Sequence, residues 1–115
     1  MPDTDVLIIG GGPGGYAAAF LGADRGLRVT LVDPEAHPGG VCVYRGCIPS
    51  KVLLHVARVI GEAAHASEWG VDFGVPALDL PKLRAFKDQV VMRLTAGTGQ
   101  LATDRKSTRL NSSHT

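Results

Sequence analysis

Short apolar runs alternate with a helix-like segment at the start of the chain. Val6 to Ile9 is an uninterrupted apolar run that ends in glycines, which is typical of a strand buried on both faces of a parallel sheet. Residues 13–25 are rich in alanine and favour a helix that ends at Gly26. Residues 28–33 form a second, β-branched run. Strand, helix and strand in this order predict a βαβ unit and an α/β fold with a parallel sheet.

Two later stretches have the spacing of amphipathic helices. Residues 34–40 are expected to form a loop, and a helix is predicted to begin around residues 49–51. Its apolar stripe comprises Val52, Leu53, Val56, Val59, Ile60 and Ala63. Asp79 can cap a further helix that has Pro81 in its first turn. The apolar face of that helix comprises Leu83, Phe86, Val90, Leu94 and Leu101.

The chain changes character after residue 103. From Asp104 onward it has no apolar period and is rich in residues that solvate well. Asp104 to His114 also resembles the translation of a common sequencing adapter, read in frame from a GATCGGAAGAGC start. We therefore predict that residues 1–103 are the N-terminal part of one domain. Residues 104–115 are predicted to be a disordered tail, a sequencing artefact without function.

Length and composition narrow the class of protein. A chain of 115 residues suffices for one modest core but is too short for two cofactor sites. With 44% hydrophobic residues, 20% charged residues and a net charge of +1, it is typical of a globular protein, and neither nucleic acid nor a membrane is expected as partner. An acidic N-terminus without a long apolar stretch predicts a cytoplasmic location, where paired cysteines are more often catalytic than structural.

The glycines between the first strand and the first helix form a G-x-G-x-x-G motif at Gly10, Gly12 and Gly15. The first glycine allows a tight turn, the second lets the backbone approach a pyrophosphate, and the third permits close packing of helix on sheet. Amides at the helix start then face the phosphates. Asp33, which ends the second strand, can bind a ribose hydroxyl. The motif predicts dinucleotide binding but does not distinguish FAD from NAD.

Cys42 and Cys47 are the only two cysteines of the chain. On a regular α-helix, residues five apart have Cα atoms about 8 to 9 Å apart, whereas a disulfide needs less than about 7 Å. If the two cysteines pair, the segment must therefore be distorted, and Gly46 can absorb the bend. A strained, accessible disulfide of this kind is easily reduced.

Other interpretations of the cysteines stay open at this point. Buried, unpaired cysteines are common in cytosolic proteins. A thioredoxin-type pair would need C-x-x-C, which is absent. We expect no metal site, because His37 is near the pair but no second pair of ligands has a suitable spacing. Composition and spacing thus leave redox-active and silent cysteines both possible.

Residues 39–51, Gly-Gly-Val-Cys-Val-Tyr-Arg-Gly-Cys-Ile-Pro-Ser-Lys, resemble the G-G-T-C-x-N-x-G-C-x-P-S-K signature of class I pyridine nucleotide disulfide oxidoreductases. The Gly-Cys-Ile-Pro-Ser-Lys ending is most similar to the dihydrolipoamide dehydrogenase branch, whereas glutathione and mercuric reductases tend to have valine before the proline. The resemblance covers residues 5–103. In this chain Val41 replaces the usual threonine, and Tyr44 and Arg45 replace an asparagine-valine pair. Val41 removes a hydroxyl, and Arg45 adds a positive charge near the sulfurs.

The resemblance implies a partial, doubly wound Rossmann-like domain that binds FAD. It implies that Cys42 exchanges with a dihydrolipoamide thiol, that Cys47 lies against the flavin, and that the flavin passes hydride to NAD, a second substrate whose site is absent here. A thiolate at Cys47 is favoured by helix-start amides near Pro49 and by the cations Arg45 or Lys51, and Lys51 is expected beside the flavin ring. The cofactor-binding residues it implies are Gly10, Gly12, Pro13, Gly14, Gly15, Asp33, Pro34, Gly40, Val41, Cys42, Gly46, Cys47 and Lys51.

The full-length enzyme implied by the resemblance is a homodimer that serves lipoyl domains of 2-oxo acid dehydrogenase complexes. Its general base, a histidine held by a glutamate, belongs to a C-terminal domain and is not among these residues, so the segment alone is expected to be inactive and poorly folded. Two alternatives are another disulfide reductase of the family, such as a mercuric or glutathione reductase, and a non-catalytic nucleotide-binding fragment.

Overall fold

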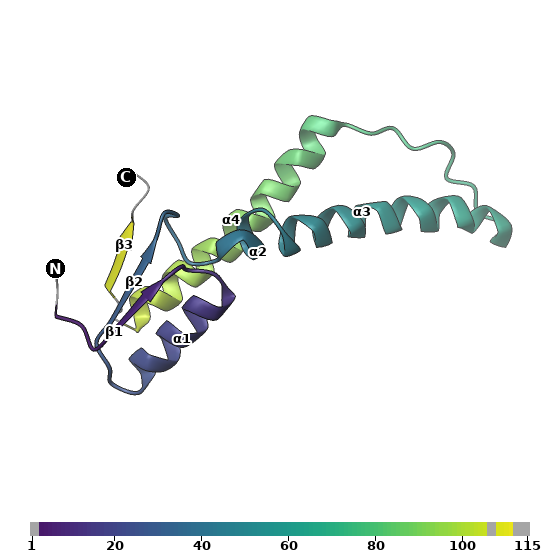
Figure 1. Cartoon of the computed structure of the whole chain (residues 1–115). Coiled ribbons are helices and arrows are strands. Elements are labelled where there is room, and N and C mark those ends of the chain that lie inside the picture. Colours follow the sequence, from purple (N-terminus) through teal and green to yellow (C-terminus); the bar gives the residue numbers. More distant parts are fainter. Residues whose placement is uncertain (1–2, 106–107, 112–115) are drawn as a thin grey trace.

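The computed structural model describes residues 3–105 and 108–111 (Figure 1). Its elements are, in chain order, β1 (Val6–Ile9), α1 (Pro13–Asp24), β2 (Val29–Asp33), α2 (Gly40–Tyr44), α3 (Cys47–His65), the 3-10 helix η1 (Ala66–Trp69), α4 (Leu80–Asp104) and β3 (Thr108–Asn111). The predicted βαβ unit at the N-terminus is confirmed, with both strands and the helix within one or two residues of their predicted bounds.

The three strands form a parallel sheet in the order β1-β2-β3. Val6 pairs with Val29, and the register continues to the pairing of Ile9 with Val32. The small core lies between this sheet and α1, where Ala19, Val29 and Leu31 are buried and are contacted by partly buried neighbours. These neighbours are Val6, Ile8, Phe20 and Ala23. A parallel sheet with crossover helices is the predicted partial Rossmann-like α/β fold.

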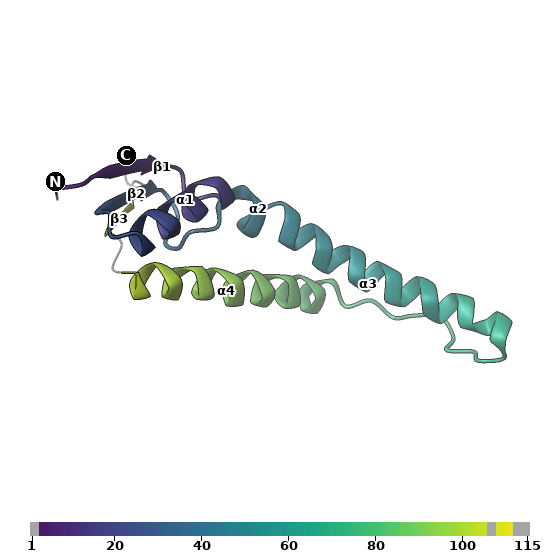
Figure 2. The same ribbon diagram turned by 90° about the horizontal axis from the view of Figure 1, so that it is seen from below.

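The prediction that β1 is buried on both faces is wrong for the described part of the chain. Val6 and Ile8 face α1, but Leu7 is 47% exposed and Ile9 is 82% exposed. Figure 2 shows the reason, because α1 and the C-terminal end of α4 lie on the same side of the strands. Among the described residues no helix covers the opposite face, so an apolar strand suited to a covered sheet carries one open face.

The tail also differs from its prediction. Asp104 is the last residue of α4, and Thr108–Asn111 pair with β2 from Thr30 to Asp33. The physical reason is that β2 offers a free edge of backbone N–H and C=O groups, which bind any extended backbone largely irrespective of its side chains. Residues 106–107 and 112–115 of the predicted disordered tail lie outside the described residues. The adapter origin of this segment stays a prediction.

The later helices agree with the pattern in part. The helix α2 was not predicted, and α3 begins at Cys47, slightly before its predicted start. The predicted cap of α4 is confirmed, because the Asp79 carboxylate accepts a hydrogen bond of 3.1 Å from the Lys82 amide. The predicted apolar stripe of α4 is only partly covered. Its buried residues are instead Thr95, Gly99 and Ala102, near the sheet.

The helices α3 and α4 extend from the sheet as a long hairpin (Figure 1). The molecule measures 65 × 30 × 18 Å and has a radius of gyration of 19.5 Å, against about 13 Å for a compact domain of 100 residues. Over its 19 residues α3 has no buried side chain. None of the described helices is both long and apolar enough to cross a membrane.

Asp5 and Arg28, which directly precede β1 and β2, form an ion pair whose strength depends on pH. Asp5 accepts hydrogen bonds from the Arg28 amide (2.8 Å) and guanidinium (2.9 Å), which lower the pKa of Asp5 from 3.8 to about 2. Because the folded-state pKa lies below the unfolded value, the stabilisation is complete above about pH 4 and disappears as the pH falls through 2. We expect Asp5→Asn to lower the melting temperature at pH 6 and to differ much less from the wild type at pH 2. Thermal unfolding across this range would contradict the assignment if the difference were constant.

Candidate active site

The glycine loop between β1 and α1 meets two steric requirements that the motif predicts. Gly10 has a φ of 105°, a region that favours glycine, and its amide continues the β1–β2 ladder with a 2.8 Å hydrogen bond to the Val32 carbonyl. A Cβ on Gly15 would collide with the carbonyl oxygen of Gly10. The tight turn and the close packing of helix on strand are thus confirmed.

The N-terminus of α1 leaves backbone amides without partners inside the helix. Gly12 is the N-cap residue and has no side chain with which to cap, and Pro13 follows it as the first helical residue. The first amide that bonds within the helix is that of Tyr16, which donates to the Gly12 carbonyl at 2.8 Å. The amides of Gly14 and Gly15 therefore have no acceptor in the helix, and this is the arrangement that binds phosphate groups.

The carboxylate of Asp33 connects the second strand to the glycine loop. Its Oδ2 atom accepts a 2.7 Å hydrogen bond from the Gly11 amide, and its Oδ1 atom accepts one of 2.8 Å from the Glu35 amide. Asp33 is buried, at 7% exposure, while Pro34 next to it is exposed. Sequence reasoning predicted a ribose ligand and missed the role of Gly11. Each carboxylate oxygen keeps a second lone pair, so both roles are compatible.

The segment before the cysteines lies directly against the glycine loop. The Gly39 amide donates a 2.7 Å hydrogen bond to the Gly11 carbonyl. Gly40 has a φ of 64°, and a Cβ on it would lie 2.5 Å from the Cα atom of Gly12. The start of α2 thus contacts the loop that precedes α1, backbone against backbone. This contact places the cysteine-bearing segment beside the free amides of α1.

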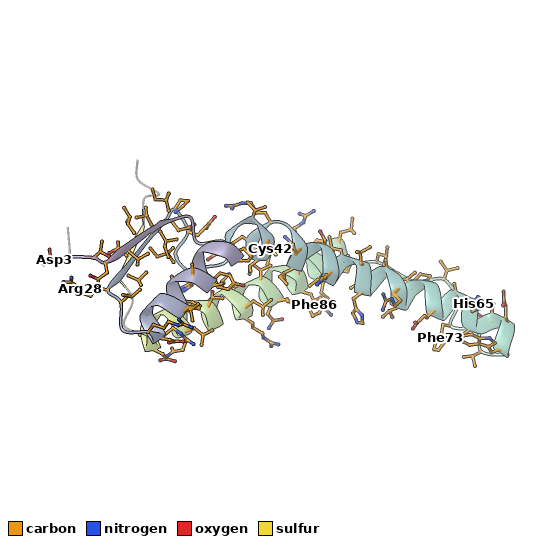
Figure 3. All side chains as sticks on the ribbon, turned by 60° about the horizontal axis from the view of Figure 1, so that its bottom comes forward. Asp3, Arg28, Cys42, His65, Phe73 and Phe86 are labelled. Carbon is orange, nitrogen blue, oxygen red and sulfur yellow. The ribbon has the colours of Figure 1, made fainter. Side chains whose placement is uncertain are left out.

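Cys42 lies in α2 and is half-buried, whereas Cys47 is the first residue of α3 and is exposed. The chain leaves helical geometry between them, at Arg45 and Gly46, so the predicted bend is confirmed. A Cβ on Gly46 would lie 3.0 Å from the Val41 carbonyl oxygen. Both cysteines are free thiols in this structure, and their side chains are in hydrogen-bonding proximity. Figure 3 shows Cys42 at the junction of the sheet domain and the helical hairpin.

The environment of the pair acts on the Cys42 thiol in opposing directions. The side-chain hydrogen bond with Cys47, the loss of solvent and the negative charge of a Cys47 thiolate raise the pKa of Cys42, while a hydrogen bond from the Cys47 backbone and the positive charge of Lys51 lower it. Cys42 therefore keeps its proton to a higher pH than a free thiol and can donate it to the Cys47 sulfur. Of the two cations that the sequence suggested, Lys51 acts on the pair.

Arg45, the other cation, pairs with a carboxylate on the loop after β2. Its Nη2 atom forms an ion pair of 2.5 Å with Glu35 Oε1, on the loop that follows β2. The neighbouring Tyr44 hydroxyl donates to the His37 carbonyl at 3.0 Å and accepts from the His37 amide at 3.3 Å. Sequence reasoning named His37 and Tyr44 but missed their contact, and it missed Glu35 as the partner of Arg45. The signal that could have revealed them was the replacement of the usual asparagine-valine pair.

The structure brings most of the predicted residues together around two contacts. The glycine loop, Asp33 and Gly40 meet at Gly11 and Gly12, and Lys51 acts on the cysteine pair one turn into α3. Val41 lies on the outer side of α2 and is 69% exposed. In the part of the chain that the structure describes, no three His, Cys, Asp or Glu side chains gather as metal ligands.

A βαβ unit with an open helix N-terminus, beside which lies a segment with two free cysteines, defines a nucleotide-binding domain that carries a dithiol centre. Residues 4–114 match the family described as pyridine nucleotide-disulphide oxidoreductase. The chain therefore belongs to the pyridine nucleotide-disulphide oxidoreductase family.

Similar curated proteins share one description. The chain is 50% identical over 105 residues to "Dihydrolipoyl dehydrogenase" of Haemophilus influenzae. This alignment covers 91% of the chain and 22% of that protein. It is 48% identical over 108 residues to the protein of that name from Vibrio parahaemolyticus, covering 94% and 23%. It is 49% identical over 98 residues to "Dihydrolipoyl dehydrogenase 2" of Haloarcula marismortui, covering 85% and 20%. The chain thus spans about a fifth of the length of these relatives.

Gly14 and Gly15, in the first turn of α1, offer a matched test of close packing. In Gly15→Ala the new methyl group meets the Gly10 carbonyl, and we expect a loss of about 2 kcal/mol in the free energy of unfolding, as for other overpacked sites. In Gly14→Ala no atom lies within 4 Å of the new Cβ, and the helix gains a better helix former. Denaturant unfolding of both variants checks this. Equal effects would show that the Gly15 contact is not steric.

The opposing influences on Cys42 can be separated by substitution. Cys47→Ala removes the hydrogen bond and the charge that raise the pKa of Cys42, so we expect its alkylation to begin at lower pH than in Cys47→Ser, which keeps a hydroxyl. Adding Lys51→Met to Cys47→Ala should move the profile back to higher pH. The rate of reaction with iodoacetamide between pH 6 and 10 measures both shifts. If Lys51→Met left the pH profile unchanged, Lys51 would have no effect on the pKa of Cys42.

Proposed function

We propose that this chain is the N-terminal part of the FAD-binding domain of a dihydrolipoyl dehydrogenase. The observation that carries the proposal is the position of the Cys42–Cys47 pair, which the Gly12–Gly40 contact places beside a dinucleotide-type glycine loop. The relatives named dihydrolipoyl dehydrogenase, together with the Gly-Cys-Ile-Pro-Ser-Lys ending at residues 46–51, favour this branch over other disulfide reductases.

The residues of the chain fit FAD. Amides at the start of α1 suit a pyrophosphate, and a Cβ on Gly12 would have only the Gly40 Cα atom within 4 Å, so the Gly12 backbone is open to the approach of a ligand. The remaining lone pairs of Asp33 suit a ribose hydroxyl. Lys51 supplies positive charge near the cysteines. When bound, the flavin supplies the capacity to accept two electrons from the dithiol and to pass them as hydride to NAD.

The chemistry of the chain itself is thiol–disulfide exchange. In the oxidised state Cys42 and Cys47 form a disulfide, and a dihydrolipoamide thiolate attacks the Cys42 sulfur, forming a mixed disulfide and releasing Cys47 as thiolate. The second substrate thiolate attacks the substrate sulfur of the mixed disulfide, closes the lipoyl ring and releases Cys42. The substrate loses two electrons, and the cysteine pair gains them. Cys42, whose pKa is raised by its hydrogen bond with Cys47, is the sulfur that takes up and holds the proton.

The partners follow from this assignment. The dihydrolipoamide groups are those of lipoyl domains in 2-oxo acid dehydrogenase complexes, and the full-length enzyme acts as a homodimer in the cytoplasm. In this proposal the NAD site and the general base lie in polypeptide beyond this segment, because the relatives are about five times its length.

The full-length protein tests the proposal. We expect Cys42→Ser and Cys47→Ser each to lower dihydrolipoamide-dependent reduction of NAD by at least about a thousandfold, because each removes one sulfur of the disulfide. Reduction of an artificial dye by NADH, which needs the flavin alone, should remain within a few-fold of the wild type. This dye reaction is the control for folding and flavin content. A wild-type protein that binds FAD but fails to oxidise dihydrolipoamide would refute the assigned substrate, and Cys variants that retain full activity would refute the role of the pair.

A further inference from the structure

The loop at residues 34–39 is bonded to three parts of the molecule. At its start, Asp33 holds both the Glu35 amide and the glycine-loop amide of Gly11. At its end, the Gly39 amide donates to the glycine loop. From the other side the Thr98 hydroxyl of α4 donates to the Pro38 carbonyl. A loop fixed at both ends and from the side is a rigid platform.

The turn between the two cysteines is attached to this platform by consecutive side chains. Tyr44 hydrogen-bonds to the backbone of His37 with both the donor and the acceptor function of its hydroxyl. Arg45 pairs with Glu35, whose side chain is 24% exposed, so the carboxylate is partly shielded from solvent. Both residues lie between Cys42 and Cys47, Tyr44 as the last residue of α2 and Arg45 where the chain leaves helical geometry. Tyr44 also stands where the family signature has asparagine, and Arg45 stands where valine is usual.

We propose that Tyr44 and Arg45 are positioning residues that clamp the turn between Cys42 and Cys47 to the platform of residues 34–39 and thereby set the spacing of the two sulfurs. The inference rests on the proposed disulfide chemistry. In this inference the charge of Arg45 holds the turn in place through its ion pair with Glu35. The clamp does what a regular helix cannot, since residues five apart on a helix are too distant for a disulfide.

The clamp has a measurable consequence for the redox equilibrium. Holding the turn raises the effective concentration of one sulfur at the other, as in other preorganised intramolecular reactions. In the reaction with dithiothreitol, the cysteine pair loses two electrons and two protons as its disulfide forms, and oxidised dithiothreitol gains them as its ring opens. A looser turn shifts this equilibrium toward the protein dithiol.

The experiment measures this equilibrium in the full-length holoprotein, without oxygen or NAD, across ratios of reduced to oxidised dithiothreitol. Acid quenching, alkylation and mass spectrometry give the fraction of disulfide. We expect Tyr44→Phe and Arg45→Gln each to favour the dithiol at least threefold, and the double variant at least tenfold. The exchanged pair Glu35→Arg with Arg45→Glu should return to within twofold of the wild type. Arg58→Gln, which removes an exposed arginine from α3, is the control for loss of charge.

The outcomes separate the clamp from a general effect on stability. Variants that melt earlier but keep the wild-type equilibrium would overturn the inference while leaving the proposed function intact. A shift in Arg58→Gln equal to that in Arg45→Gln would overturn it too, because net charge would then explain the result. A wild-type protein that forms no Cys42–Cys47 disulfide at any buffer ratio would refute the proposed function itself.

Discussion

The approach of the Gly40 backbone to the Gly12 backbone is the contact on which the rest of the site depends. A single methyl group at Gly40 would come within 2.5 Å of the Gly12 Cα atom. The contact joins the start of α1 in the βαβ unit to the segment that carries the cysteines. Asp33 supports the same junction through the Gly11 amide. Nucleotide-binding geometry and dithiol geometry are therefore fixed by one set of contacts.

The two cations near the cysteines, Lys51 and Arg45, act on different partners. Lys51 lies one turn after Cys47, on the same helix, and its positive charge lowers the pKa of Cys42. Arg45 lies between the cysteines in sequence, yet its guanidinium binds Glu35 on the loop after β2. Proximity in sequence is thus a poor guide to which cation acts on a thiol, because a guanidinium on a flexible side chain goes to the carboxylate that can bind it.

Features that depend on local chemistry could be predicted from the sequence. The strands at residues 6–9 and 29–33, the alanine-rich helix between them and the Asp79 cap follow from propensity and spacing, and the helix break at Gly46 follows from disulfide geometry. Features that depend on distant partners could not. Nothing in the periodicity indicates that Tyr44 reaches the His37 backbone. The exposed face of β1 could not be predicted either, because an apolar run indicates that a strand can be buried but does not show which element covers it.

The distribution of burial shows which part of the chain is held by its own contacts. The helix α3 has no buried residue along its length, and packing rather than propensity normally stabilises such a helix. The first turn of α3 differs from the rest of the helix, because the turn before it is bonded to the loop after β2 through Tyr44 and Arg45. Apolar side chains such as Trp69 (69% exposed) and Phe73 (68% exposed) cluster at the far end of the hairpin. The cysteine pair thus lies at the end of α3 that α2 and the turn at Gly46 position, whereas the far end of the hairpin carries exposed apolar side chains.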